Sequence, residues 1–124
     1  MRAAEFRVRC ERIGLLPTQI ARELDVARRT ADRWWATLDP NPAAVDLLVD
    51  REDHLHSLAE AAVSGAERVR AEHGHPEAVQ LHTFRDDNTA LREAQMPASQ
   101  HRALTGLICE MLDAEGLPFT VDWA

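Results

Sequence analysis

The chain contains 124 residues, which is enough for one domain or for a small head and a second small unit that share a core. Its apolar content is typical of a globular protein, and no apolar run approaches the ~18–20 residues that a membrane span needs. The first residues, MRAAEFRVRCERIG, alternate charged and apolar side chains and lack the apolar core of a signal peptide. These features argue against a membrane or secreted protein, and we expect a cytoplasmic one.

The net charge of −7 is distributed unevenly along the chain. Residues 1–37 contain eight arginines and five acidic residues, whereas residues 38–124 contain six arginines and sixteen acidic residues. Salt screens surface charges beyond ~8–10 Å, so the charges of the N-terminal segment itself determine whether that segment attracts phosphates. An acidic chain of this kind is therefore still able to bind nucleic acid through its N-terminal segment.

Residues 17–35, PTQIARELDVARRTADRWW, have the pattern of two short helices joined by a tight turn. Apolar residues at helical spacing and in the turn are predicted to face inward: Ile20, Ala21, Leu24, Val26, Ala31 and Trp34. The outward face of the second helix carries Arg28, Arg29 and Arg33, with Thr30 and Asp32 between them. A short helix with three arginines on its exposed face fits a DNA major groove.

This pattern resembles the helix-turn-helix of bacterial and phage repressors of the Cro/repressor-like class. Asp25 stands where that family most often has glycine, and a left-handed backbone is accessible to aspartate at a higher cost than to glycine. The resemblance covers about a sixth of the chain. Together with the charge pattern, it predicts contacts with DNA from these side chains: Thr18, Gln19, Arg28, Arg29, Thr30 and Arg33. The alternative is an ordinary helical hairpin whose arginines are only a solvated face.

Residues 3–15 are predicted to form a helix before this pattern, because Phe6, Cys10 and Ile13 recur at helical spacing. The Thr18 hydroxyl is a candidate N-cap for the helix that follows. Trp34 and Trp35 point about 100° apart on a helix. We expect Trp34 in the core of a three-helix head and Trp35 packed against the next helix.

A turn at residues 39–42, DPNP, is predicted to precede a long helix over residues 43–73. Its apolar positions recur at steps of three and four: Val45, Leu48, Leu55, Leu58, Ala59, Ala62, Ala66 and Val69. Glu52 interrupts this stripe, and Gly65 marks a point where we expect the helix to bend or break. We interpret the segment as a connector between two subdomains.

A second boundary is predicted at residues 74–76, Gly-His-Pro. Residues 78–84 and 117–123 alternate in polarity and are predicted strands. Between them we expect a turn at 85–88, a short helix at 89–95, and a helix that begins near a Ser99 cap and ends about Glu115. Two isolated strands are not stable alone, so they should pair with each other or with a second subunit.

The large apolar residues of this last segment favour burial against a partner chain. The candidates for dimerisation are Phe84, Phe119, Val121 and Trp123. The predicted fold is therefore mainly α, with an N-terminal helix-turn-helix head, a helical connector and a small C-terminal strand-helix-strand dimerisation unit. Residues 1–73 form the head and connector in this prediction, and residues 74–124 form the dimerisation unit.

The sequence gives little support for metal binding or catalysis. His54 and His56, and likewise His73 and His75, lie two residues apart and diverge on a helix. The sequence has no HExxH or CxxC metal motif, no glycine-rich phosphate loop and no nucleophile elbow. The two cysteines are interpreted as reduced packing residues. We therefore expect a protein that is not an enzyme and needs neither a metal nor a cofactor.

The whole layout resembles the anti-CRISPR-associated autoregulatory repressors of phages. That resemblance implies a homodimer that binds an inverted repeat in a promoter and represses its own operon, with no small-molecule ligand. The alternative is an antitoxin-like interaction module, in which the acidic segment after residue 38 neutralises a partner protein and DNA binding is secondary. A toxin gene or an anti-defence gene in the same operon would distinguish the two.

Overall fold

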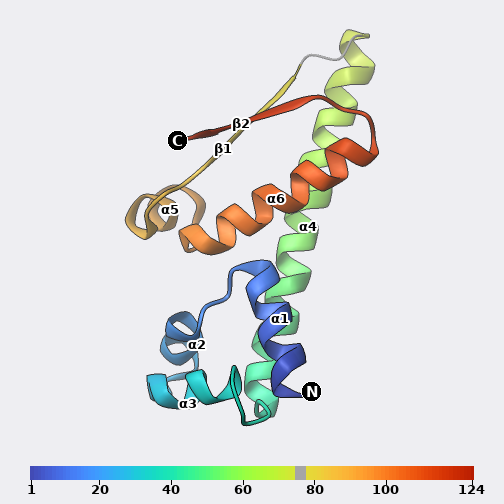
Figure 1. Cartoon of the computed structure of the whole chain (residues 1–124). Coiled ribbons are helices and arrows are strands. Elements are labelled where there is room, and N and C mark those ends of the chain that lie inside the picture. The colour runs from blue at the N-terminus through green and yellow to red at the C-terminus, as the bar shows by residue number, and fades with distance from the viewer. Residues whose placement is uncertain (75–77) are drawn as a thin grey trace. The chain divides into compact units, whose positions relative to one another are not determined.

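The computed structural model describes residues 1–74 and 78–124 (Figure 1). It confirms that the chain is mainly α-helical, with a small two-stranded sheet in its C-terminal part. The elements are α1 (Ala3–Ile13), α2 (Pro17–Leu24), α3 (Arg28–Trp34), α4 (Pro42–His73), β1 (Val79–Thr83), α5 (Asp87–Ala94), α6 (Ala98–Ala114) and β2 (Phe119–Trp123). Among the described residues, no helix is long and apolar enough to cross a membrane.

The chain divides into two compact units, Met1–His54 and Leu55–Ala124. The division falls inside α4, whereas the sequence predicted a boundary after His73. Of the buried residues of α4, Leu48 belongs to the first unit, and Leu55 is the first that belongs to the second. Part of the predicted boundary at 74–76 falls on residues 75–77, which lie outside the described residues.

The first unit packs α1, α2, α3 and the start of α4 around one apolar core. The buried apolar residues are Ala3, Phe6, Cys10, Ile13, Leu15, Ile20, Ala31, Trp34, Ala44 and Leu48. The helical spacing in the sequence correctly predicted the inward positions of α1 and α3. Gly14 ends α1 at φ 68°, in the left-handed region that suits glycine, and its N–H bonds back to the carbonyls of Cys10 and Glu11.

The two short helices α2 and α3 are joined by the predicted tight turn. Asp25 ends α2 in the left-handed conformation, at φ 52° and ψ 49°. The predicted Thr18 cap is wrong, because α2 begins at Pro17, two residues earlier than a Thr18 cap requires, and Leu16 occupies the N-cap position. Gln19 supplies the hydrogen bond instead, since its Oε1 accepts from the Leu16 N–H at 3.0 Å.

Polar side chains tie the ends of the first-unit helices together. Asn41 Oδ1 accepts from the Ala44 N–H at 2.8 Å, so it caps α4 just before Pro42 takes the first helical position. Asp39 Oδ1 accepts from the Ala3 N–H at 2.9 Å. The turn predicted at residues 39–42 thus also satisfies an amide at the start of α1.

Glu52 joins α4 to α1 through two arginines. Arg9 donates to it from both Nε and a terminal nitrogen, at 3.0 and 2.6 Å, and Arg12 donates at 3.1 Å. The hydrogen bond from Arg9 is the main reason that the pKa of Glu52 lies below its ordinary value of 4.5. The Glu52 side chain is only 11% exposed. The residue that interrupts the apolar stripe is therefore a partly buried charge with matched partners.

We predict that Glu52→Gln lowers the free energy of unfolding by about 1.5–3 kcal/mol, the range for a hydrogen bond to a charged group. Urea unfolding followed by tryptophan fluorescence measures this, because Trp34 and Trp35 lie in the first unit. The control is Asp53→Asn, which removes an exposed charge from the same turn of α4.

The same pair predicts a pH dependence. The lowered pKa means that the stabilisation is complete above the ordinary carboxyl pKa of 4.5 and is lost as pH falls through the lower, folded-state pKa. Wild type and Glu52→Gln should therefore converge in stability in acid. Equal stability of the two proteins at neutral pH would contradict this role of Glu52.

The second half of α4 continues unbroken through Gly65 to His73, so the helix does not break at Gly65. Gly65 has open space around it apart from the Arg68 side chain. The buried residues of this half are Leu55, Ala59 and Val63, spaced four apart. Ala62 and Val69 were predicted to face inward but are exposed, because the buried stripe follows a four-residue step here.

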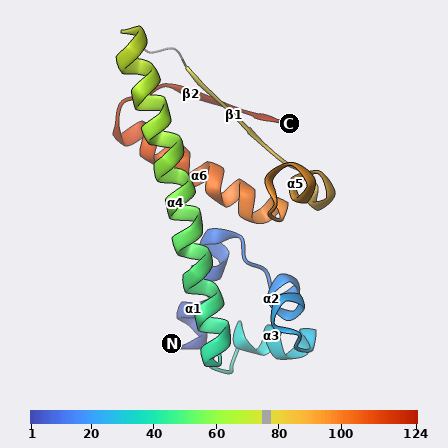
Figure 2. The same cartoon turned by 180° about the vertical axis from the view of Figure 1, so that it is seen from behind.

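The second unit combines α5, α6 and the sheet with the C-terminal half of α4 (Figures 1 and 2). Asp86 caps α5, because its carboxylate accepts from the Thr89 N–H at 2.9 Å. The predicted Ser99 cap of α6 is wrong: Pro97 is the N-cap residue, and Asp87 Oδ1 accepts from the Ala98 N–H at 2.9 Å. α6 buries Leu104, Ile108 and Leu112, as its spacing predicted, together with the polar residues Gln100 and Thr105.

The two strands pair with each other in parallel, and α5 and α6 form the crossover between them. Val79 pairs with Phe119, Leu81 with Val121, and Thr83 with Trp123. The pairing within one chain was one of the two predicted arrangements. Side chains alternate along β1, with Val79, Leu81 and Thr83 less exposed than their neighbours.

His101 of α6 lies against the end of β1. Its Nδ1 is 2.9 Å from the Thr83 hydroxyl, and its ring meets the Phe84 ring edge-on at 4.7 Å. Burial lowers the pKa of His101 below its ordinary value of 6.5. The neutral imidazole is therefore the form that this part of the fold accommodates.

We predict that the second unit loses stability as pH falls below about 6.5, because the unfolded chain then binds a proton that the folded His101 resists. Urea unfolding between about pH 7.5 and 5.5 measures this slope. His101→Gln should flatten it, whereas His56→Gln, at an exposed position of α4, should leave it unchanged. An unaltered slope in His101→Gln would show that other groups cause it.

Candidate nucleic-acid interface

The exposed face of α3 carries the predicted arginines. Arg28, Arg29 and Arg33 are all exposed, while Ala31 and Trp34 on the opposite face are buried at 0% and 3% exposure. α3 is only seven residues long, so these two buried residues fix the direction of the whole helix. The arginines therefore point away from the core of the first unit.

The three arginines are not equivalent. Arg28 Nε donates to the Asp32 carboxylate at 3.0 Å, four residues further along the same face. Both side chains are more than half exposed, at 57% and 51%, and such a surface pair contributes little to stability. It does neutralise much of the local charge of Arg28.

Arg29 and Arg33 are the unneutralised cations of α3. They are four residues apart and share one face of the helix. Among the described residues, neither of them forms an ion pair with a carboxylate. The structure thus brings together two arginines whose planar groups are available for bidentate hydrogen bonds.

The other predicted DNA contacts differ in exposure. Thr18 is exposed near the start of α2, whereas Gln19 and Thr30 are half-buried. The Gln19 oxygen is already bonded to the Leu16 N–H. Gln19 therefore has a structural role at the start of α2, and Thr18 is the more accessible of the two neighbouring residues.

Contacts outside α2 and α3 hold these helices in place. Glu23 of α2 forms an ion pair with Arg51 of α4. Trp35 lies beside α1, where the Arg7 guanidinium sits 5.5 Å from its ring centre. Burial raises the pKa of the neighbouring Cys10 thiol to about 12, which makes Cys10 an unreactive packing residue. Trp35 is half-buried, and its contacts with Arg7 and Cys10 are with α1, whereas the sequence predicted packing against the following helix.

The predicted dimerisation residues divide into two groups. Phe84 is 8% exposed and packs with Ala90 and Ala98 inside its own chain, so it has little surface for a partner. Phe119 is half-buried. Val121 and Trp123 are 42% and 49% exposed, and the Arg85 guanidinium lies 4.9 Å from the Trp123 ring centre.

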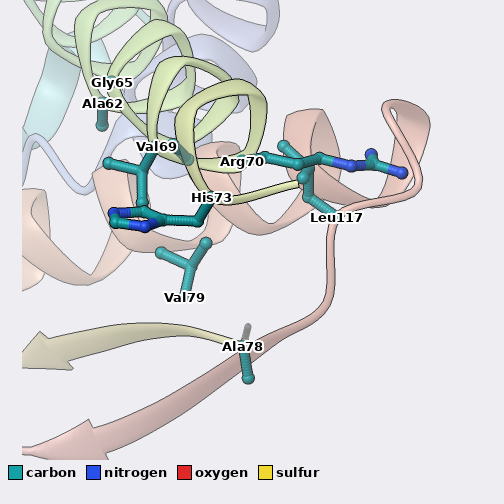
Figure 3. Close-up of a pocket in the computed structure, with 9 residues that line it drawn as sticks. Ala62, Gly65, Val69, Arg70, His73, Ala78, Val79 and Leu117 are labelled. Atoms are coloured by element: carbon teal, nitrogen blue, oxygen red, sulfur yellow. The ribbon is translucent and has the colours of Figure 1, made fainter. Parts of the chain in front are cut away.

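The second unit also contains a mainly apolar pocket of about 250 Å³ at the end of α4 (Figure 3). Ala62, Ala66 and Val69 of α4 line it, together with Val79 of β1 and Leu117, which precedes β2. His73 lies next to Val69, and Arg70 extends away along the pocket rim in the close-up (Figure 3). Among the residues that the structure describes, no group of three or more histidine, cysteine or acidic side chains is placed to hold a metal ion.

Comparison with known proteins yields no family assignment: no family model and no curated protein matches this chain. The sequence indicated the exposed arginines of α3, but it did not distinguish Arg28 from the other two. The i, i+4 spacing of Arg28 and Asp32 was the available signal for that difference.

Proposed function

We propose that this chain is a sequence-specific DNA-binding repressor of the helix-turn-helix type, in which α3 is the recognition helix. The observation that carries the proposal is the pair Arg29 and Arg33, exposed on a short helix whose other face is fixed by Ala31 and Trp34. In this proposal α3 enters the major groove, and the two arginines reach guanine edges or adjacent phosphates.

The charge distribution supports an orientation in which α3 faces the DNA. Residues 1–37 carry a net charge of +3, and within this segment α3 contributes three of the eight arginines. The acidic residues after position 38 repel phosphate and disfavour other orientations. Arg28 joins the contact when its weak pair with Asp32 opens, and Thr18 lies near the backbone phosphate at the start of α2.

The proposed repressor acts as a homodimer on an inverted repeat in its own promoter, as in the anti-CRISPR-associated autoregulators that it resembles. Two-fold symmetry would place the two α3 helices in successive major grooves, about 34 Å apart or a multiple of that distance. The exposed Val121 and Trp123 of the second unit support association of two chains.

The experiment that tests this function is a gel shift with DNA from upstream of the gene at two salt concentrations, about 50 and 200 mM. We expect one saturable complex whose affinity falls by orders of magnitude at the higher salt, as several phosphate contacts require. Unrelated DNA of equal length is the control. Absence of any complex at low salt, with a partner protein copurifying in stoichiometric amount, would favour the antitoxin-like alternative.

We predict that Arg29→Ala and Arg33→Ala each weaken operator binding by about 1–3 kcal/mol. If the arginine reads guanine, discrimination at one base position is lost, whereas a phosphate contact gives a uniform loss and a smaller salt slope. Fluorescence anisotropy with a panel of single-base operator variants measures both.

The matched control is Arg68→Ala, which removes an exposed arginine from α4 of the second unit. It makes the same change in net charge outside the proposed interface. If Arg68→Ala weakens binding as much as Arg29→Ala and Arg33→Ala, the effect is one of overall charge, and α3 is not the recognition helix.

A further inference from the structure

Among the residues that the structure describes, β2 pairs only with β1, so its other edge is open. Two backbone hydrogen bonds at the ends of the β1–β2 pair show which residues of β2 face β1. The Val79 N–H donates to the Pro118 carbonyl at 2.8 Å, and the Ala124 N–H donates to the Thr83 carbonyl at 2.9 Å. In a parallel pair, alternate residues direct their backbone groups toward the neighbouring strand. The even-numbered residues of β2 therefore face β1, and the backbone groups of Phe119, Val121 and Trp123 face away from it.

These outward backbone groups have no hydrogen-bond partner among residues 1–74 and 78–124. The sequence FTVDW contains no lysine and no proline, two residues that often protect an open edge, although the strand is only five residues long. Asp122 is its one charged residue. A two-stranded sheet with such an edge is a template for a further strand.

The side chains at this edge are apolar on one face and polar on the other. Paired residues of a parallel sheet lie on the same face, so Val121 and Trp123 continue the face of Leu81 and Thr83. The β1 members of this face are buried or half-buried, whereas Val121 and Trp123 are 42% and 49% exposed. The apolar face therefore extends past the part that the chain itself covers.

We propose that β2 pairs antiparallel with β2 of a second copy of this chain, across a two-fold axis at Val121. The product is a four-stranded sheet in the order β1, β2, β2 of the second copy, β1 of the second copy. This inference rests on the homodimer of the proposed function and specifies how the two chains associate. Such an interface is isologous, because each chain contributes the same strand.

The register follows from the direction of the free backbone groups and from charge. Outward-facing residues meet as hydrogen-bonded pairs in an antiparallel ladder, so Val121 faces Val121 of the second copy and Phe119 faces its Trp123. On the polar face, Thr120 then lies opposite Asp122 of the second copy, a pair of acceptor and hydroxyl donor.

Neighbouring registers are less favourable. A shift that places Asp122 opposite its own copy brings two carboxylates together, which destabilises a strand pair. A shift the other way, with Thr120 opposite its own copy, leaves Trp123 beyond the end of the partner strand. The register centred on Val121 is the one that overlaps the full strand without like charges facing each other.

Disulfide trapping tests the pairing and its register. Cα atoms of a hydrogen-bonded antiparallel pair lie about 5.5 Å apart, within the range that a disulfide spans. In a Cys109→Ala background, with Cys10 buried, we expect Val121→Cys to form a covalent dimer on mild oxidation, seen on a non-reducing gel. Thr120→Cys should remain mostly monomeric on the gel, because it faces Asp122 of the second copy. Rapid crosslinking of Thr120→Cys but not Val121→Cys would overturn the register.

A charge at the axis provides the second test. Val121→Lys places two ammonium groups opposite each other, and we expect its dimer dissociation constant, measured by sedimentation equilibrium, to rise at least about tenfold. Thr120→Lys is the matched control, because it faces Asp122 of the second copy and should leave dimerisation intact. Circular dichroism verifies that both variants fold. A monomeric wild-type chain, or a Val121→Lys variant that dimerises as the wild type does, overturns the proposal.

The two proposals fail in different ways. A chain that dimerises through β2 but ignores its promoter DNA disproves the repressor function and retains the strand pairing. A chain that binds its operator, while Val121→Lys dimerises normally, disproves the strand pairing and retains the function.

Discussion

The ion pair between Glu52 and Arg9, supported by Arg12, is the constraint on which the first unit depends. A partly buried carboxylate on the inner face of α4 is costly unless cations pair with it, since removing one partner leaves an uncompensated charge. The bidentate geometry of Arg9 fixes both the distance and the rotation between α1 and α4. Apolar packing alone tolerates small sliding movements, whereas this pair specifies one arrangement.

Ion pairing within the first unit also determines which arginines remain for other uses. Arg9 and Arg12 neutralise Glu52, Arg51 neutralises Glu23, and Arg28 is paired with Asp32. The same internal contacts that stabilise the helices thus remove several cations from the surface field. Within the part of the chain that the structure describes, fewer arginines of the N-terminal segment are therefore unpaired than the sequence count suggests. Two of these unpaired ones, Arg29 and Arg33, lie on the exposed face of α3.

Helical periodicity in the sequence predicted the helices of the described residues, the inward residues of α1, α3 and α6 and the outward arginines of α3, because local spacing decides these features. It failed for Ala62 and Val69 in the second half of α4, which are exposed. Glu52 was read as an interruption, since its partners lie about 40 positions earlier in the chain. The hydrogen bonds at the starts of α2 and α6 were not predicted for a related reason. Gln19 and Asp87 accept from the backbone N–H groups of Leu16 and Ala98, and these contacts depend on how the chain folds back at each helix start. The parallel direction of the strands and the burial of Phe84 depend on tertiary packing, which no local pattern contains.

The parallel pairing of β1 with β2 has a consequence for the order of folding. α5 and α6 separate the two strands in sequence, so β2 finds its neighbour only after a long loop has closed and its entropy has been overcome. Contacts of this kind form late, after the local helices. A nascent or partly folded chain would then have no ordered edge to offer, and association would be restricted to molecules whose second unit is complete.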